Sequence, residues 1–166
     1  VEGLEIAGYS APAQEVGGDY YDFFDVDAEH LGIAIADVAG KGIPGAVVMA
    51  AVRSTLRAEA RGDLSPRAVL LRLNRQLLLD TSPNVFVTMT YAILNRRTFR
   101  LRFARAGHEP VIICSQAHGE NPSLYTPEGI ALGLVGDDLF QVTEEREVGL
   151  QSGEVVVFYT DGVVEA

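Results

Sequence analysis

Residues 33–45 of the chain read IAIADVAGKGIPG, and the interpretation of the remaining sequence starts from this stretch. Its apolar beginning predicts a buried strand that ends on one carboxylate, Asp37. Glycines follow, and Pro44 stands where a helix can begin, because the missing N–H of proline would be unpaired in a first helical turn anyway. The stretch therefore predicts a strand, an acidic corner, a glycine turn and a helix over about residues 46–60.

A second run of residues predicts the partner of this strand. Residues 19–26 read DYYDFFDV, and the polar residues 27–30 separate them from a strand over residues 31–38. A short polar connection favours antiparallel pairing, which brings the start of one strand to the end of the other. We therefore expect Asp19 and Asp37 to be neighbours in space.

The order of the other elements predicts an α+β fold. Strands and helices do not alternate regularly, which argues against a doubly wound parallel sheet. Two stacked antiparallel sheets, with a pair of helices packed on one face, fit this order better. We expect a first strand over residues 4–12, a second helix that begins at Pro66 with Ser65 as its N-cap, and strands over residues 85–94, 98–104, 110–114, 124–125, 140–148 and 154–159.

Length and composition indicate a single domain over residues 1–166. The net charge of −10 argues against a nucleic-acid partner or an anionic membrane surface, since both would require a basic patch. No apolar run approaches the ~18 residues that a membrane span requires. The single cysteine, Cys114, suits a reducing compartment, so we expect a cytoplasmic protein.

Three aspartates share a similar sequence context. Asp19 follows two glycines, Asp37 leads into a glycine turn, and Asp161 precedes Gly162. Hard cations such as Mg²⁺ and Mn²⁺ prefer oxygen ligands and retain several waters, which suits carboxylates at strand ends. The alternative is that these Asp-Gly and Gly-Asp pairs only mark turns. The sequence pattern by itself leaves both interpretations open.

Four motifs, in order along the chain, carry a resemblance to a known family. They are residues 17–23 (GGDYYDF), 37–42 (DVAGKG), 106–110 (AGHEP) and 159–166 (YTDGVVEA). With these motifs the chain resembles the PP2C-type (PPM) serine/threonine phosphatases. Within them it is similar to the bacterial branch of stage II sporulation E and sigma-factor-regulating phosphatases.

The resemblance implies a fold, a reaction and a set of site residues. The fold would be a β-sandwich of two antiparallel sheets flanked by helices, with a two-metal Mn²⁺ or Mg²⁺ centre. Asp19 would hold one metal, Asp37 would bridge both with the backbone carbonyl of Val38 as a further ligand, and Asp161 would hold the other metal. The three aspartates would be the catalytic residues, and a metal-activated water would hydrolyse phosphoserine or phosphothreonine. The substrate would be a regulatory protein of the anti-sigma-factor-antagonist type.

The chain departs from the family pattern at its end. The family normally has a further metal-binding Asp, followed by a final strand, after the Thr-Asp-Gly motif. We therefore expect a C-terminally truncated fragment that lacks this strand and fills its two-metal centre only in part. We also expect an upstream sensor or receiver domain in the longer protein. The alternative function is a PP2C-fold regulatory module that binds a partner without turnover.

Asp22 and His108 are expected to have supporting roles. Asp22 lies three positions after Asp19, so its side chain should point to the opposite face of the strand. His108 lies in a Gly-His-Glu-Pro turn. It could act as a general acid, but hydrogen bonding of the turn is the favoured interpretation.

Overall fold

Alternation along one central strand, β2 (His30–Val38), joins the two halves of the core. Ala34 and Ala36 face the helices, whereas Leu31 and Ile33 face the opposite direction, because successive side chains of a strand point to opposite faces. β2 pairs antiparallel with a strand on each side. The predicted hairpin over residues 19–38 is confirmed by this pairing.

The computed structural model describes residues 3–11, 18–39, 43–80, 85–115 and 121–163. Along the chain, its elements are β1 (Asp19–Asp25), β2, α1 (Ile43–Glu59), α2 (Pro66–Asp80), β3 (Val87–Asn95), β4 (Arg100–Ala106), β5 (Val111–Ser115), β6 (Ser123–Tyr125), α3 (Asp137–Phe140), β7 (Glu145–Gly149), β8 (Glu154–Val157) and the 3₁₀ turn η1 (Asp161–Val163).

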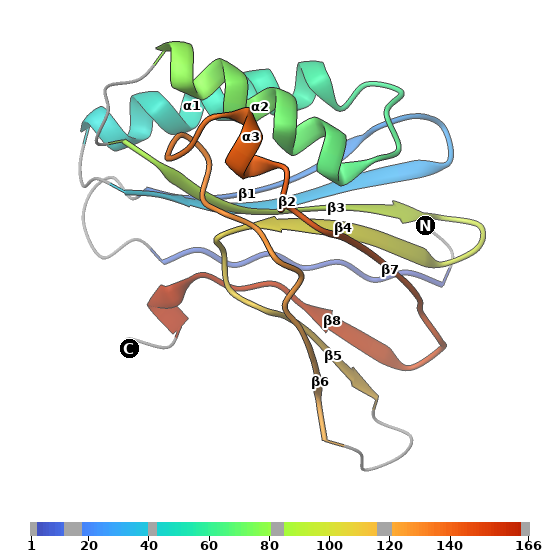
Figure 1. Ribbon diagram of the computed structural model, residues 1–166. Helices are drawn as coiled ribbons and strands as arrows, with labels where there is room; N and C mark the ends of the chain where they lie inside the picture. Colours follow the sequence, from blue (N-terminus) through green and yellow to red (C-terminus); the bar gives the residue numbers. More distant parts are fainter. Residues whose placement is uncertain (1–2, 12–17, 40–42, 81–84, 116–120, 164–166) are drawn as a thin grey trace.

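The described strands form two antiparallel sheets. A five-stranded sheet has the order β1-β2-β3-β4-β7, and a three-stranded sheet has the order β6-β5-β8. Helices α1 and α2 cover one face of the larger sheet, and the smaller sheet lies against its other face (Figure 1). The predicted α+β sandwich, with its helical pair on one face, is confirmed.

Two apolar clusters hold these three layers together. One lies between the helices and the larger sheet, and it includes Leu56, Leu73 and Tyr91. The other lies between the two sheets and includes Phe103 and Val111. Strand β3 contributes to both clusters, which explains why it is buried over nearly its whole length.

The start of each long helix follows the sequence signals. Pro44 lies in the first turn of α1, as expected. Ser65 caps α2, because its hydroxyl accepts a hydrogen bond from the backbone N–H of Ala68 at 3.2 Å. The Ser65 hydroxyl also donates to Glu145 of β7, so this cap ties the helix to the edge of the larger sheet.

The predicted strand over residues 4–12 is wrong for residues 4–11, and residue 12 lies outside the described part. These residues are almost all exposed and enter no ladder with the described strands. Gly8 instead packs on the ring of Tyr21, so closely that a Cβ there would lie 2.4 Å from a ring carbon. The alternation of residues 4–11 therefore does not correspond to a buried sheet face.

The two last predicted strands are shorter than expected. In place of a strand from residue 140, the short helix α3 carries Phe140 into the core beneath α2, and β7 begins only at Glu145. At the end of the chain, β8 stops at Val157 rather than at residue 159. The residues that follow β8 lead instead to Asp161, which lies near Asp19 and Asp37.

Asp22 has the structural role that was predicted for it. Its carboxylate accepts two hydrogen bonds of 2.7 Å from the Arg57 guanidinium of α1, and a third from the Tyr20 hydroxyl at 2.6 Å. Burial by itself would raise the pKa of Asp22, but the bonds from Arg57 and Tyr20 outweigh it and lower this pKa. The pair therefore joins β1 to α1 on the face opposite Asp19.

We predict that Asp22→Asn lowers the free energy of unfolding by about 1 kcal/mol near pH 7, because a half-exposed charge-assisted pair is lost. Because the pKa of Asp22 is lower in the folded state, its ionisation stabilises the protein fully above the ordinary value of 3.8. This stabilisation is lost as the pH falls from 3.8 through the lowered pKa of the folded state. Denaturant unfolding at pH 7 and below pH 4 should therefore show the difference shrinking at the lower pH. Asp25→Asn, which affects a more exposed pair with Arg96, serves as the control. Equal loss in both variants at all pH values would contradict this role for Asp22.

Candidate active site

A single row of register partners places two of the predicted site residues. Asp19 of β1 lies opposite Asp37 of β2, and Asp37 lies opposite Thr88 of β3. Directly paired residues of an antiparallel ladder point to the same face. Asp37 lies four residues after Ile33 in β2, so both side chains point to the same face of the sheet. Ile33 packs in the cluster between the two sheets, so this row faces the smaller sheet. The expected closeness of Asp19 and Asp37 is therefore confirmed.

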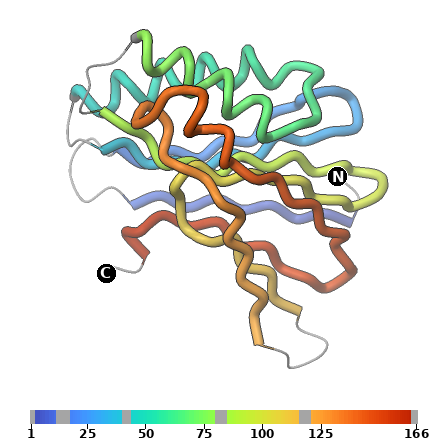
Figure 2. Tube along the Cα trace, viewed as in Figure 1, coloured from blue at the N-terminus to red at the C-terminus, as the bar shows by residue number. Residues whose placement is uncertain are grey.

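The third aspartate reaches the same place from the other sheet. Asp161 begins η1, just after β8. Its negative charge raises the pKa of both Asp19 and Asp37, which places all three carboxylates within electrostatic reach of one another. The β4–β5 connection and the segment after β8 lie at the same end of the molecule (Figure 2).

Burial and nearby negative charges both act on Asp37. Its burial, followed by the charges of Asp19 and Asp161, raises the pKa of Asp37 to about 6 from 3.8. Burial is also the main cause that raises the pKa of Asp19, although a hydrogen bond from Thr160 acts in the opposite direction. A cation would stabilise the ionised form of Asp37, which burial and the charges of Asp19 and Asp161 disfavour.

Gly18 leaves open the space beside these oxygens. A Cβ at Gly18 would lie 2.9 Å from Oδ1 of Asp37 and 3.0 Å from the carbonyl oxygen of Val38. The two oxygens therefore border one small volume that any larger residue would fill. Carboxylate and carbonyl oxygens are suitable donors for Mg²⁺ or Mn²⁺. The donor set thus fits the ion that the sequence motifs imply.

The carboxylates do not form a closed cage. Among the residues that the structure describes, no three His, Cys, Asp or Glu side chains converge as a metal-binding group. Mg²⁺ in proteins is commonly held by one or two carboxylates and retains several waters. An ion here would accordingly use Asp37, the Val38 carbonyl and waters, with Asp19 or Asp161 to one side.

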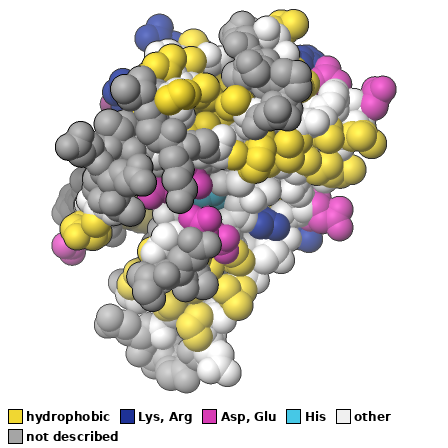
Figure 3. Space-filling view, turned by 90° about the vertical axis from the view of Figure 1, so that its left-hand side faces the viewer, with side chains coloured by type: hydrophobic (Ala, Val, Ile, Leu, Met, Phe, Trp, Pro, Cys, Tyr) yellow, Lys and Arg dark blue, Asp and Glu magenta, His cyan; other side chains and the backbone are white. Residues whose placement is uncertain are grey.

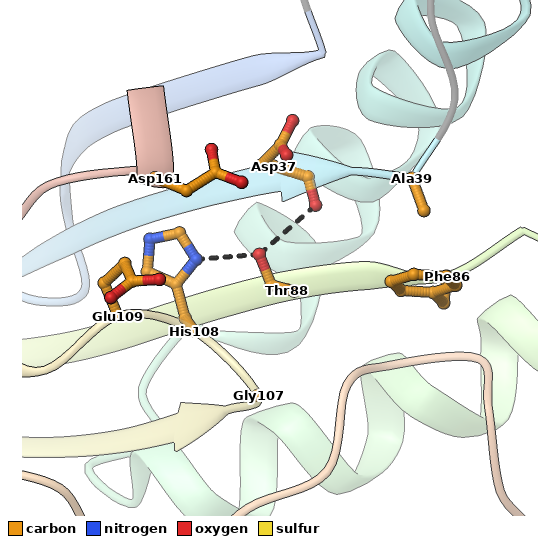
Figure 4. A pocket seen from close by; sticks show the side chains of 8 residues that line it. All are labelled: Asp37, Ala39, Phe86, Thr88, Gly107, His108, Glu109 and Asp161. Atoms are coloured by element: carbon orange, nitrogen blue, oxygen red, sulfur yellow. Dashed lines mark hydrogen bonds between the residues drawn. The ribbon is translucent and has the colours of Figure 1, made fainter. Parts of the chain in front are cut away.

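A cavity of about 390 Å³ opens beside Asp37 and Asp161. Its other lining residues are Ala39, Phe86, Thr88, Gly107, His108 and Glu109 (Figure 4). Figure 3 looks onto this end of the molecule and shows Asp and Glu side chains gathered near the middle of the face. The cavity and the aspartates therefore form one continuous site.

His108 is more deeply buried in this site than a residue that only stabilises a turn needs to be. Its side chain is buried, and its Nδ1 lies 2.8 Å from the Thr88 hydroxyl. Burial lowers the pKa of His108 to about 4; Arg105 adds to this shift, whereas the Tyr159 backbone and Asp161 oppose it. The ring is therefore neutral near pH 7, which favours hydrogen bonding over general-acid catalysis.

Sequence reasoning missed Thr88, Phe86 and Glu109. The one available signal was the strand predicted over residues 85–94, since pairing it with the strand of Asp37 would have placed a residue near its start beside that aspartate. The exact partner depends on the register, which the sequence did not provide. Lys41, in the motif over residues 37–42, lies outside the described residues.

Comparison with known proteins now identifies the family. The family model described as stage II sporulation protein E (SpoIIE) matches residues 27–166. The chain belongs to the SpoIIE family. This SpoIIE-family chain is 36% identical over 166 residues to the phosphoserine phosphatase RsbU of Bacillus subtilis, covering 99% of the chain and 48% of RsbU. The chain thus spans about half the length of this curated relative, and less of the others.

Solved structures share the fold of the SpoIIE-family chain. The RsbU and RsbW domains of a Mycobacterium tuberculosis protein match with a TM-score of 0.78 at 24% identity, over 93% of this chain and 42% of that one. The PP2C phosphatase domain of Bacillus subtilis SpoIIE, solved with a fragment of its regulatory domain, matches with a TM-score of 0.76 at 19% identity, over 92% and 42%. The predicted PP2C-like fold and the family resemblance are both confirmed.

We predict that Asp37→Asn stabilises the metal-free protein. The ionised Asp37 destabilises the folded state above its raised pKa, and asparagine removes that charge while keeping the shape. After allowance for solvent screening we expect about 1 kcal/mol, or a Tm increase of about 2–4 °C, measured at pH 7.5 in a chelating buffer. Asp138→Asn, an exposed change on α3, is the control and should leave Tm unchanged. A lower Tm for Asp37→Asn would show that the repulsion is absent.

Proposed function

We propose that this SpoIIE-family chain is a Mn²⁺- or Mg²⁺-dependent protein phosphatase that hydrolyses phosphoserine or phosphothreonine. The observation that carries the proposal is the position of Asp37, which is paired with Asp19 in the larger sheet and feels the charge of Asp161 from the other sheet. Asp37 and Asp161 line the same cavity. The name of RsbU, a phosphoserine phosphatase 36% identical to the chain, supports the same reaction class.

Each site residue has a distinct part in this proposal. Asp19 would hold one cation, and Asp161 the other. Asp37 would contact both, with the Val38 carbonyl as a further donor beside the space at Gly18. Divalent cations held in this way would activate water and neutralise charge on phosphoryl oxygens.

The cavity suits a phosphorylated side chain that brings its own charge to the cations. None of the described residues that line it is a lysine or an arginine. The guanidinium of Arg105 donates to the carbonyl groups of Pro127 and His108. Phe86 and Ala39 offer apolar contacts for the carbon atoms of the substrate, while Glu109 disfavours acidic groups at the wall.

The partners in this proposal follow from the same resemblance. The substrate would be a phosphorylated regulator of the anti-sigma-factor-antagonist type, and an upstream sensory domain would control the activity in the cytoplasm. A SpoIIE-family domain within a longer protein is also consistent with relatives of about twice this length or more. No helix in the described part of the chain is both long and apolar enough to cross a membrane.

The proposal predicts Mn²⁺-stimulated release of phosphate from a phosphoserine peptide by the 166-residue chain. Asp37→Asn should lower kcat/KM by about 100-fold or more, since even changes to groups around metal ligands cost about 10–100-fold. Asp138→Asn is the matched control, with the same chemical change far from the site. Mn²⁺ binding without hydrolysis would favour the alternative, a regulatory binding module. Hydrolysis that survives in Asp37→Asn would overturn the proposed mechanism.

A second prediction tests the space beside Asp37. Gly18→Ala would place a methyl group within about 3 Å of two donor oxygens, so we expect Mn²⁺ affinity to fall at least 10-fold by calorimetric titration. Gly149→Ala is the control, because no atom lies within 4 Å of a Cβ built there. Equal affinity in the two variants would mean that the space at Gly18 does not serve an ion.

A further inference from the structure

Nothing in the sheet hydrogen bonding fixes Asp161 relative to Asp37. Asp19 and Asp37 are held by the register of β1 and β2, within the larger sheet. Asp161 instead follows β8 of the smaller sheet, and no described strand of one sheet pairs with a strand of the other. Some other contact must therefore set the distance between these carboxylates.

His108 occupies the crossing between the two sheets. It lies on the connection from β4 of the larger sheet to β5 of the smaller one. Its side chain is only 5% exposed, so it is fixed by its surroundings. Gly107 before it has φ +63°, and a Cβ there would lie 2.8 Å from the backbone nitrogen of Ala131, so the turn accepts only glycine at this position.

One side of the His108 ring contacts the larger sheet. Nδ1 lies 2.8 Å from the Thr88 hydroxyl, and Thr88 is the register partner of Asp37 (Figure 4). The same hydroxyl lies 3.5 Å from the Asp37 carbonyl oxygen, which is at the limit for a hydrogen bond. The contact to His108 is the shorter of the two, and it joins the ring to the strand that lies beside Asp37.

The other side of the ring faces the segment that carries Asp161. His108 and Asp161 line the same cavity (Figure 4). Burial lowers the pKa of His108, and the Tyr159 backbone and the charge of Asp161 act in the opposite direction, as is expected of groups close to the ring. Nε2, on this side of the ring, is buried and makes no hydrogen bond to any described residue. Thr160, next in the chain, donates to Asp19.

The hydrogen bond between Thr88 and His108 forms in either tautomer of the neutral ring. Nδ1 either accepts from the Thr88 hydroxyl, or carries the proton and donates to it while the hydroxyl donates to the Asp37 carbonyl. In both cases removal of the Thr88 hydroxyl would leave a buried polar atom of the ring without its partner.

We propose that Thr88 and His108 are positioning residues that hold the Tyr159–Asp161 segment of the smaller sheet at a set distance from Asp37 of the larger sheet. The inference rests on the proposed metal centre, because its functional effect is the spacing of two metal-binding carboxylates. Neither residue touches the phosphoryl group in this role. They act through the placement of Asp161.

The test compares two substitutions at one position. Thr88→Val keeps the branched shape and removes the hydroxyl, whereas Thr88→Ser keeps the hydroxyl and is the matched control. Amide hydrogen exchange in the metal-free chain should be faster in Thr88→Val for residues 159–163, and unchanged for residues 30–38 of β2. Calorimetric titration should show that Mn²⁺ binds to Thr88→Val about 10–100-fold more weakly than to the original chain, with Thr88→Ser close to the original.

A second variant covers the other contact. Asn at position 108 can still accept from Thr88, but it is too short to reach Tyr159, so His108→Asn should also speed exchange at residues 159–163. Unchanged exchange there in both Thr88→Val and His108→Asn would overturn the positioning role. So would a lower Tm in both variants with unchanged exchange and Mn²⁺ affinity, since that pattern indicates packing alone.

The two proposals fail in different ways. If the original chain takes up no Mn²⁺, the proposed metal function is wrong, and hydrogen exchange alone decides the positioning role. If the original chain and Thr88→Val take up Mn²⁺ with equal affinity, the metal function stands and the effect of Thr88 on metal binding is overturned.

Discussion

The register of β2 with its two neighbours is the constraint on which the site depends. One ladder position aligns Asp19, Asp37 and Thr88 in a row across three strands, and a slip of one residue would turn Asp37 toward the helices. Buried apolar partners on both faces of β2 prevent that slip. The same packing holds carboxylates together against their mutual repulsion, so the stability of the core offsets the strain of an acidic site.

Local features of the sequence predicted most of the fold around this row. The hairpin followed from a short polar connection, and it correctly placed Asp19 beside Asp37. The helix starts at Pro44 and Ser65 also follow from local chemistry, because proline has no N–H to leave unpaired in a first turn and the Ser65 hydroxyl accepts from a backbone N–H. The prediction that the Asp22 side chain points away from that of Asp19 needed only the alternation of side chains along a strand.

Long-range contacts account for what the sequence did not predict. Asp161 reaches Asp19 and Asp37 only through the stacking of two sheets, and only the family resemblance connected them beforehand. Thr88 has no motif, and its importance comes from register. Residues 4–11 alternate like a strand but are almost all exposed, so the alternation of polar and apolar residues by itself gave a wrong prediction there. Phe140 likewise fills a gap in the core as part of a short helix rather than a strand.

The position of the site across two sheets has a consequence for how the protein tolerates change. The layer between the sheets, centred on Phe103 and Val111, acts as a spacer whose thickness sets the geometry of the acidic corner. Side chains in that layer therefore affect both the packing of the core and the distance between the two sheets. Substitutions that keep the chain folded but change the thickness of the layer would alter the spacing of Asp37 and Asp161 from a distance, without changing either residue.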